Sequence, residues 1–263
     1  MLKDAENWLA DIGLGKAPDH ATLHRAAAWL LRATCVNRLL DAVARWASQA
    51  RLLGLSTKPL TMDSTVYESH HVSRHYEKRC HQTRKRMRRS EWAKRGRHRT
   101  RSQTVRGLPK LAIAVPAACH LVLSYWTGTG AGSDHPHFKP LLAQARARVP
   151  HRRLKSVQDA GYDSEANHVW ARGELGVQTV TPPWHGRPRQ DGLPPGGYWR
   201  RRMVAKMRDL ESRRACGYNQ RVQCETVNSM MKRNCSSELR GATAWSRKRD
   251  MALKVITHDA MIL

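Results

Sequence analysis

Residues 154–183 read "LKSVQDAGYDSEANHVWARGELGVQTVTPP", and this order of patterns decides the fold class. The residues before Asp159 predict a short strand, and "GVQTVTPP" predicts another strand, which two prolines end. Between them, "DSEANHVWARGEL" predicts a helix with Asp163 or Ser164 as its cap. The residues expected to pack inward from this helix are Ala166, Val169, Trp170 and Leu175.

The segments on the N-terminal side of this stretch extend the same alternation. "PLTMDSTVYES", residues 59–69, predicts a short strand with Asp63 near its C-terminal end. Residues 108–130 predict two β segments, and "HPHFKPLLAQARARV", residues 135–149, predicts a helix. This order of elements indicates an α/β fold with a mixed sheet flanked by helices.

Residues 1–53 have the apolar spacing of short helices, with a capping candidate at Asp19 or Thr22. We therefore expect a helical N-terminal region, residues 1–54, ahead of a larger domain, residues 55–263. The helices could read the sequence of a DNA end, in the manner of a helix-turn-helix, or could simply pack on the larger domain. Both interpretations stay open.

The charge of the chain is its most unusual property. Lys and Arg number 47 against 21 Asp and Glu, which gives a net charge of +26 and a pI near 10.9. The excess positive charges repel one another in a compact fold, and binding of a polyanion reduces this repulsion. Nucleic acid is therefore the expected partner. A membrane partner is not expected, because no long uncharged apolar stretch is present.

Two segments interrupt the α/β pattern. Residues 74–106 hold fourteen Lys or Arg against two Glu, a net +12, and this density favours contacts to DNA phosphates over a solvated loop. The densest run of this segment is Arg84, Lys85, Arg86, Arg88 and Arg89. Residues 182–197 contain nine Pro or Gly and predict a loop, which a basic helix over 198–214 follows.

The beginning of the chain, "MLKDAENWLADIG", carries early acids and no apolar core of a secretion signal, so we expect a cytoplasmic protein. The six cysteines are scattered without CxxC pairs and are expected to be reduced thiols.

Three acids stand where carboxylates can carry chemistry. Asp63 and Asp159 each close a predicted strand, so both would reach one sheet edge if the strands are neighbours. Glu225, on a predicted late helix, would approach from the side. Three carboxylates suit Mg²⁺, with Mn²⁺ as a substitute, and two such ions support phosphoryl transfer. Simpler roles stay open: a turn residue for Asp63, backbone capping for Asp159, and a surface ion pair with Arg221 for Glu225. Asp163 is the competing ligand nearby.

The stretch "CGYNQRVQCETVNSMMKRNC", residues 216–235, predicts a helix with a polar stripe. Tyr218, Arg221, Glu225 and Lys232 lie at offsets 0, 3, 7 and 14, within about 60° of one another on a regular helix. Arg offers a forked contact to phosphate, Lys a point charge and Tyr a hydroxyl donor. Lys232 lies about 10 Å along the helix from Glu225, so it is expected to meet a neighbouring nucleotide.

"TMDST", "QDAGYDSEANH" and the Tyr-x2-Arg-x3-Glu-x6-Lys pattern at 218–232, in this order, resemble the DDE transposases of bacterial insertion sequences. The resemblance spans residue 59 to the end, where "THDAMIL" looks like the closing helix of the family. "APDHATLHRA" is similar to its N-terminal helical region. The resemblance implies a ribonuclease H-like core, in a compact form without a large β insertion, because 66 residues separate Asp159 from Glu225.

By this resemblance, the three acids form a metal-binding catalytic triad, while Tyr218, Arg221 and Lys232 hold phosphates at the ends of the element. Trp184 and Trp199 either stack on a flipped base or bury area. The implied enzyme acts as a dimer or larger assembly on DNA in a prokaryotic cell, at the nucleoid. It cleaves at element ends and joins the freed 3′-hydroxyl to target DNA. The alternatives are a metal-dependent nuclease on the same core and an inactive basic remnant that binds DNA as a repressor.

Overall fold

The computed structural model describes residues 13, 16–69, 109–129, 134–149, 154–183 and 196–263. Its contacts divide the chain into one unit up to Arg38 and a second unit, Leu39–Leu263. The first unit holds helix α2 (His20–Leu30), which Asp19 caps by accepting a hydrogen bond from the Thr22 backbone N–H at 2.7 Å. Helix α3 (Ala33–Gln49) begins in the first unit and continues into the second. The division expected at residue 54 stays a prediction.

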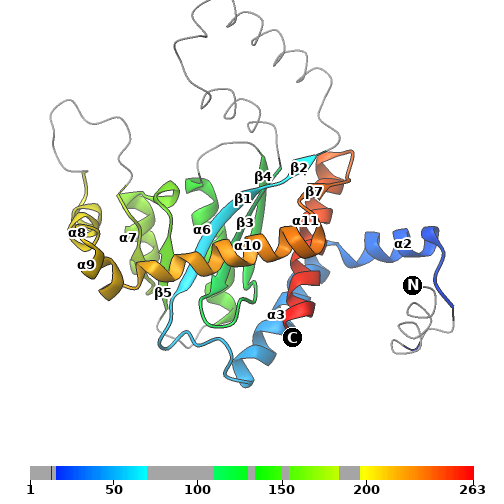
Figure 1. Ribbon diagram of the computed structural model, residues 1–263, viewed down its shortest axis with the longest axis horizontal. Helices are drawn as coiled ribbons and strands as arrows, with labels where there is room; N and C mark the ends of the chain where they lie inside the picture. Colours follow the sequence, from blue (N-terminus) through cyan, green and yellow to red (C-terminus); the bar gives the residue numbers. More distant parts are fainter. Residues whose placement is uncertain (1–12, 14–15, 70–108, 130–133, 150–153, 184–195) are drawn as a thin grey trace, which may run out of the picture. The chain divides into compact units, whose positions relative to one another are not determined.

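A five-stranded sheet in the order β4-β3-β1-β5-β6 forms the centre of the second unit (Figure 1). Its strands are β1 (Leu60–Val66), β3 (Pro109–Pro116), β4 (Ser124–Thr129), β5 (Lys155–Gln158) and β6 (Gln178–Val180). β1 pairs antiparallel with β3 and parallel with β5, so the predicted mixed sheet is confirmed. The remaining pairs are antiparallel between β3 and β4 and parallel between β5 and β6.

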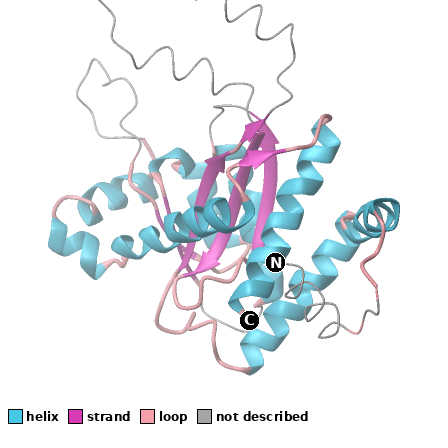
Figure 2. Ribbon diagram, turned by 45° about the vertical axis from the view of Figure 1, so that its right-hand side comes forward, coloured by secondary structure: helices cyan, strands magenta, loops and turns pink. Residues whose placement is uncertain are grey.

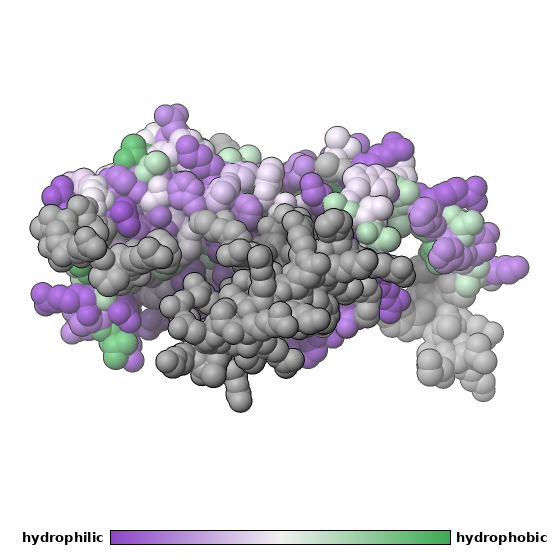
Figure 3. Space-filling model, turned by 90° about the horizontal axis from the view of Figure 1, so that it is seen from above, coloured by the Kyte–Doolittle hydropathy of each residue, from purple (hydrophilic) through white to green (hydrophobic). Residues whose placement is uncertain are grey.

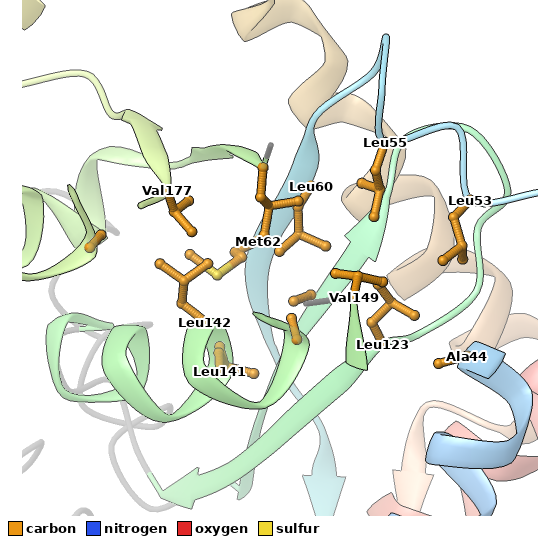
Figure 4. Close-up of a cluster of buried hydrophobic side chains, with 14 of the residues drawn as sticks. Ala44, Leu53, Leu55, Leu60, Met62, Leu123, Leu141, Leu142, Val149 and Val177 are labelled. Carbon is orange, nitrogen blue, oxygen red and sulfur yellow. The ribbon is translucent and has the colours of Figure 1, made fainter. Parts of the chain in front are cut away.

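One face of the sheet carries the main hydrophobic core (Figure 4). Side chains alternate along a strand, so Leu60 and Met62 of β1 point to the same side, where they pack with Leu141 and Leu142 of α6 (His135–Arg148). Burial of a Leu or Met side chain contributes about 1.5–3 kcal/mol. A one-residue slip of β1 would remove these residues from the core, so this face fixes the register.

The opposite face is covered by α10 (Val222–Cys235), which contacts β1 and β3 and crosses in front of the strands in Figure 1. The buried Cys224 thiol of α10 lies 3.8 Å from the Ile113 carbonyl of β3. The Asp63 carboxylate of β1 lies 3.5 Å from Asn228 Nδ2 of α10, so Asp63 faces α10, whereas its neighbour Met62 faces the core. Helix α11 (Ala244–Ile262) packs beside α10, and Figure 2 shows helices on both sides of the sheet.

Helix α7 (Glu165–Gly173) has a different inward face from the predicted one. Of the four residues expected inside, Trp170 and Leu175 pack on the core, whereas Ala166 and Val169 are exposed. The helix instead buries Asn167 and His168, because both side chains find hydrogen-bond partners there. Asn167 donates to the Tyr162 carbonyl at 3.1 Å, and His168 Nδ1 lies 2.5 Å from Thr179 Oγ1. Ser164, rather than Asp163, is the N-cap residue.

The basic helix predicted over 198–214 is two helices, α8 (Tyr198–Lys206) and α9 (Leu210–Ala215). Asp209 separates them, because its carboxylate accepts a hydrogen bond from the Ser212 backbone N–H at 2.7 Å and starts a new helix. The predicted helix over 216–235 likewise has two parts, the 3₁₀ helix η3 (Tyr218–Arg221) followed by α10.

The second unit is a mixed α/β fold, as the sequence patterns predict, with a ribonuclease H-like core, as the resemblance implies. A two-stranded sheet, β2 (Glu68–Ser69) with β7 (Glu238–Leu239), and the 3₁₀ helix η2 (Ala160–Tyr162) complete it. Seen from above, the described surface is mainly hydrophilic with scattered hydrophobic residues (Figure 3). Within the described ranges, no helix has the length and apolar character needed to cross a membrane.

Candidate active site

Asp63 and Asp159 lie together where the parallel pairing of β1 and β5 ends. The last paired residues are Met62 and Gln158, so each aspartate stands one position beyond the same pair. Neighbouring strands lie about 4.8 Å apart, and equivalent positions of parallel strands point to the same face. Both carboxylates therefore belong to the face that α10 covers.

The two aspartates differ in their place along their strands. Asp159 directly follows β5, as predicted. Asp63 is the fourth of the seven residues of β1, so the prediction that it closes its strand was wrong. β1 continues past Asp63 because β3 still pairs with it up to Val66, while the shorter β5 has already ended. The parallel pairing of the two strands therefore stops where β5 ends, although β1 continues.

Asp63 is a largely buried carboxyl group near two others. Burial raises its pKa to about 6, and the nearby charges of Asp159 and Glu225 act in the same direction. A backbone hydrogen bond and the guanidinium of Arg221 act against this increase. Asn228 Nδ2 lies 3.5 Å from Asp63 Oδ2, at the long limit of a hydrogen bond. Ionised Asp63 is consequently repelled by its neighbours, and a cation beside it would relieve that repulsion.

Glu225 and Arg221 form an ion pair at the start of α10. Their Oε1 and guanidinium nitrogen are 2.6 Å apart, and the side chains are 46% and 22% exposed. Burial alone would lower the pKa of Arg221, but the charges of Tyr218, Glu225 and the two aspartates outweigh burial and raise it. The ion pair that the sequence offered as a simple surface role is therefore present. The charges of Asp63 and Asp159 also act on the pKa of Arg221, so the ion pair borders the same site as the two aspartates.

Tyr218 and Arg221 lie on η3 rather than on α10. A 3₁₀ helix has three residues per turn, so these two side chains are nearly eclipsed instead of about 60° apart. The Tyr218 hydroxyl and Arg221 share a hydrogen bond, and burial raises the pKa of Tyr218. The 3₁₀ turn therefore brings the Tyr218 and Arg221 side chains closer to one direction than a regular α-helix would.

Lys232 lies further along α10, against the ring of Tyr67. Its ammonium nitrogen is 5.5 Å from the ring centroid, within the range of a cation–π contact. Burial lowers the pKa of Lys232, while the charges of Glu68 and Asp63 oppose this shift. Lys232 is thus a half-buried cation near β2, and its charge interacts with that of Asp63 in the site.

The donor set fits a hard divalent cation, because carboxylate oxygens are the ligands that Mg²⁺ prefers. Asp63 and Asp159 are in register and face one side, and the repulsion at Asp63 favours a cation. Glu225 bonds Arg221, and the described part of the chain gathers no group of three or more His, Cys, Asp or Glu residues that could hold a metal ion. Glu225 would have to leave Arg221 to join the other two acids.

Two contacts of Asp63 and of its neighbour Ser64 were not predicted from sequence. Asn228, three residues after Glu225, is buried beside Asp63, and its position at the edge of the helical stripe was the available signal. Asp134 accepts a hydrogen bond from Ser64 Oγ at 2.6 Å and pairs with the buried Lys110 at 2.5 Å. No sequence pattern links Asp134 to Ser64, because the contact joins residues that are 70 positions apart.

Asp163, the competing ligand, has a structural role instead. Its side chain is fully buried and receives three contacts from Arg200 of α8, at 2.7, 2.9 and 3.1 Å. The Glu165 carboxylate of α7 caps the start of α8, because it accepts hydrogen bonds from the backbone N–H groups of Trp199 and Arg200. Together these acids hold α8 against α7.

Several predicted residues lie outside the described part of the chain. They are Trp184 and the basic run Arg84, Lys85, Arg86, Arg88 and Arg89. Trp199 is described, and its ring packs against Arg172, whose guanidinium carbon is 4.0 Å from the ring centroid. The predicted roles of the basic run stay predictions.

A family model described as "Transposase DDE domain" matches residues 54–258. The match includes every element that builds the site, from β1 to most of α11. No curated protein and no solved structure matches the chain.

Proposed function

Because the chain belongs to the family of DDE transposases, we propose that it cleaves DNA at the ends of an insertion sequence and joins the freed strand to target DNA. The observation that supports this most directly is the common register of Asp63 and Asp159 on neighbouring parallel strands, both facing the helix that carries Glu225. β1, which carries Asp63, contacts both β5, which Asp159 follows, and α10, which carries Glu225, and these contacts support the proposed triad.

The proposed ligands of a divalent cation, Mg²⁺ with Mn²⁺ as a substitute, are Asp63, Asp159 and Glu225. When bound, the cation would supply Lewis acidity and an activated oxygen nucleophile for phosphoryl transfer. The chain's own residues bind and orient the DNA. Arg221 offers two parallel donors to a phosphate, and Tyr218 is eclipsed with Arg221 on the same turn. A phosphate on Arg221 would compete with Glu225 for its guanidinium and release that carboxylate.

The reaction needs no external source of energy. In cleavage, water attacks a phosphodiester and a DNA 3′-hydroxyl leaves. In joining, that hydroxyl attacks a target phosphodiester, and a target 3′-hydroxyl leaves in its place. One phosphodiester bond replaces another in the second step. We further propose that the protein acts as a dimer or larger assembly, and that the N-terminal helices supply any base-specific readout.

The test uses the purified full-length protein and a duplex that carries the inverted repeats flanking its gene. With Mg²⁺ or Mn²⁺, we expect nicking at the repeat end and joined products. Asp159→Asn is expected to abolish both reactions while it retains DNA binding, and Asp63→Ala and Glu225→Ala are expected to abolish chemistry as well. Glu211→Gln, which changes an exposed acid of α9, serves as the control and should remain active.

The outcomes separate the three functions. Nicking without joined products would identify a nuclease on the same core. Salt-sensitive binding with no chemistry in either metal would identify a DNA-binding remnant. Unchanged activity in the three acid variants would refute the assignment of the site, whatever the reaction is.

A further inference from the structure

Four cations gather beside η3, near strands β5 and β6 at one end of the strand order of the sheet. They are Lys155 at the start of β5, Arg172 in the last turn of α7, and Arg202 and Lys206 on α8. Trp199, Arg202 and Lys206 lie at offsets 0, 3 and 7, which places them within about 60° on one face of α8. This group of four is called the α8 cation cluster below.

Arg172 is held in a fixed position within the cluster. Its guanidinium carbon lies 4.0 Å from the centroid of the Trp199 ring, and one terminal nitrogen donates to the Thr179 carbonyl at 2.8 Å. Its Nε is buried and has no hydrogen-bond partner. Arg202 approaches the same ring, with its guanidinium carbon 5.8 Å from the centroid, so Trp199 brings the two guanidinium groups close to each other.

The cluster brings like charges together. Burial lowers the pKa of Lys206, and the charges of Arg172, Lys155 and Arg202 lower it further. The pKa of Arg172 is lowered by burial and by Arg202. Among the described residues, none of the four forms an ion pair with Asp or Glu, whereas their neighbour Arg200 is paired with Asp163. Uncompensated cations in this arrangement favour an anion.

The cluster is also tied to the catalytic elements. Asp163 and Glu165, which follow Asp159 in the same motif, fix α8 through Arg200 and through the start of the helix. At the other end, Lys155 Nζ lies 3.6 Å from the position of a Cβ on Gly217, the residue before Tyr218. Lys155 precedes Asp159 by four strand residues, which corresponds to about 13 Å.

We propose that the α8 cation cluster binds the phosphodiester backbone of DNA beside the active site. The ligand's identity as DNA rests on the proposed function. The face of α8 from Trp199 to Lys206 is about 10 Å long, which is enough to contact neighbouring phosphates of one strand and more than a single free phosphate would occupy. Lys155 lies about 13 Å along the strand from Asp159, so the contacted phosphates belong to nucleotides that flank the bond that is cleaved.

The experiment measures DNA binding without divalent metal, so that it does not depend on catalysis. A fluorescent 30-bp duplex is titrated with the full-length protein at a series of KCl concentrations, and anisotropy gives Kd. The test variant is Arg202→Gln/Lys206→Gln. The matched control, Arg201→Gln/Arg208→Gln, removes two charges from the same region of chain at exposed positions outside the cluster. Circular dichroism of each variant verifies that it is folded, and Lys155→Gln replaces the test variant if it is not.

We expect the test variant to raise Kd by about tenfold or more at 100 mM salt. The slope of log Kd against log salt should fall by about 1.8, since each lost phosphate contact removes about 0.9. The control should change Kd by less than about threefold, with a nearly unchanged slope. Equal losses in both double variants would refute the proposal in favour of a general effect of charge, and an unchanged slope in the test variant would refute it directly. A negative result in this binding assay would not affect the cleavage assay of the proposed function. Conversely, absence of cleavage would not change the measured DNA affinities.

Discussion

The buried pair of Asp163 and Arg200 offers a quantitative test of how α8 is held. The Asp163 side chain has no exposed area, while that of Arg200 is 23% exposed. His168 Nε2 is 3.9 Å from Asp163, but burial lowers the pKa of His168 to about 4, so this ring is neutral at pH 7 and Arg200 is the charged partner of Asp163. Arg200→Met would therefore leave a buried carboxylate without its main cation. We predict a loss of about 3–5 kcal/mol in the free energy of unfolding.

The assay is a double-mutant cycle by urea unfolding at pH 7, followed by tryptophan fluorescence and circular dichroism. Asp163→Asn should cost less than Arg200→Met, because the Arg200 side chain can reach water. The double variant should recover much of the loss, since it leaves no buried charge, and the coupling energy should be at least about 2 kcal/mol. Arg208→Met provides the matched control, because its pair with Asp209 is exposed, with side chains 85% and 46% accessible. Its effect should stay below about 1 kcal/mol.

A coupling energy below about 1 kcal/mol would refute this reasoning, because that value is typical of an exposed pair. It would mean that water or another group compensates Asp163 when Arg200 is absent. The attachment of α8 would then depend on Glu165 and on packing rather than on the buried pair.

Three further predictions concern the site and its supports. Asp259 has its pKa raised to about 8 by burial, so in the fold it stays protonated where the unfolded chain, with a pKa near 3.8, already ionises. The wild-type protein should therefore lose stability relative to Asp259→Asn as the pH rises from about 4 to 8, by several kcal/mol at most, in urea titrations at each pH. Arg221→Ala should weaken DNA binding yet strengthen binding of Mn²⁺ without DNA, because it frees Glu225 and removes a nearby cation; weaker Mn²⁺ binding by calorimetry or electron paramagnetic resonance would contradict this. Gly197→Ala should destabilise the fold by about 1–3 kcal/mol in urea unfolding, because Gly197 has φ of 101° and a Cβ there would overlap Glu165.

Much of the fold was predictable because its signals are local. Strands β3, β4, β5 and β6 appear where β-branched residues and turn residues predict them, and Asp159 directly follows β5. The inward face of α7 was not predictable in the same way. Hydrophobic periodicity favours Val169, but the fold buries Asn167 and His168, whose partners lie in η2 and β6. A pattern based on hydrophobicity cannot anticipate that polar side chains are buried where hydrogen-bond partners meet them.

The candidate site also has features that the sequence predicts and features that only the tertiary structure shows. The residue types and their order, with two aspartates near strand ends and the Tyr-Arg-Glu-Lys spacing, indicate the family without coordinates. Only the tertiary structure shows that β1 and β5 are neighbours, that β1 runs on past Asp63, and that a 3₁₀ turn eclipses Tyr218 with Arg221.

The sequence by itself determined the position of most strands and helices, the excess of positive charge and the family, because each of these depends on local composition and spacing. The tertiary structure decided which charges are compensated. Arg200 pairs with the buried carboxylate of Asp163, and Arg221 pairs with Glu225. The α8 cation cluster comes from three separate elements, and no described acid is paired to it. Compensation depends on distances between residues far apart in the chain, and those distances exist only after the strands have paired and the helices have packed.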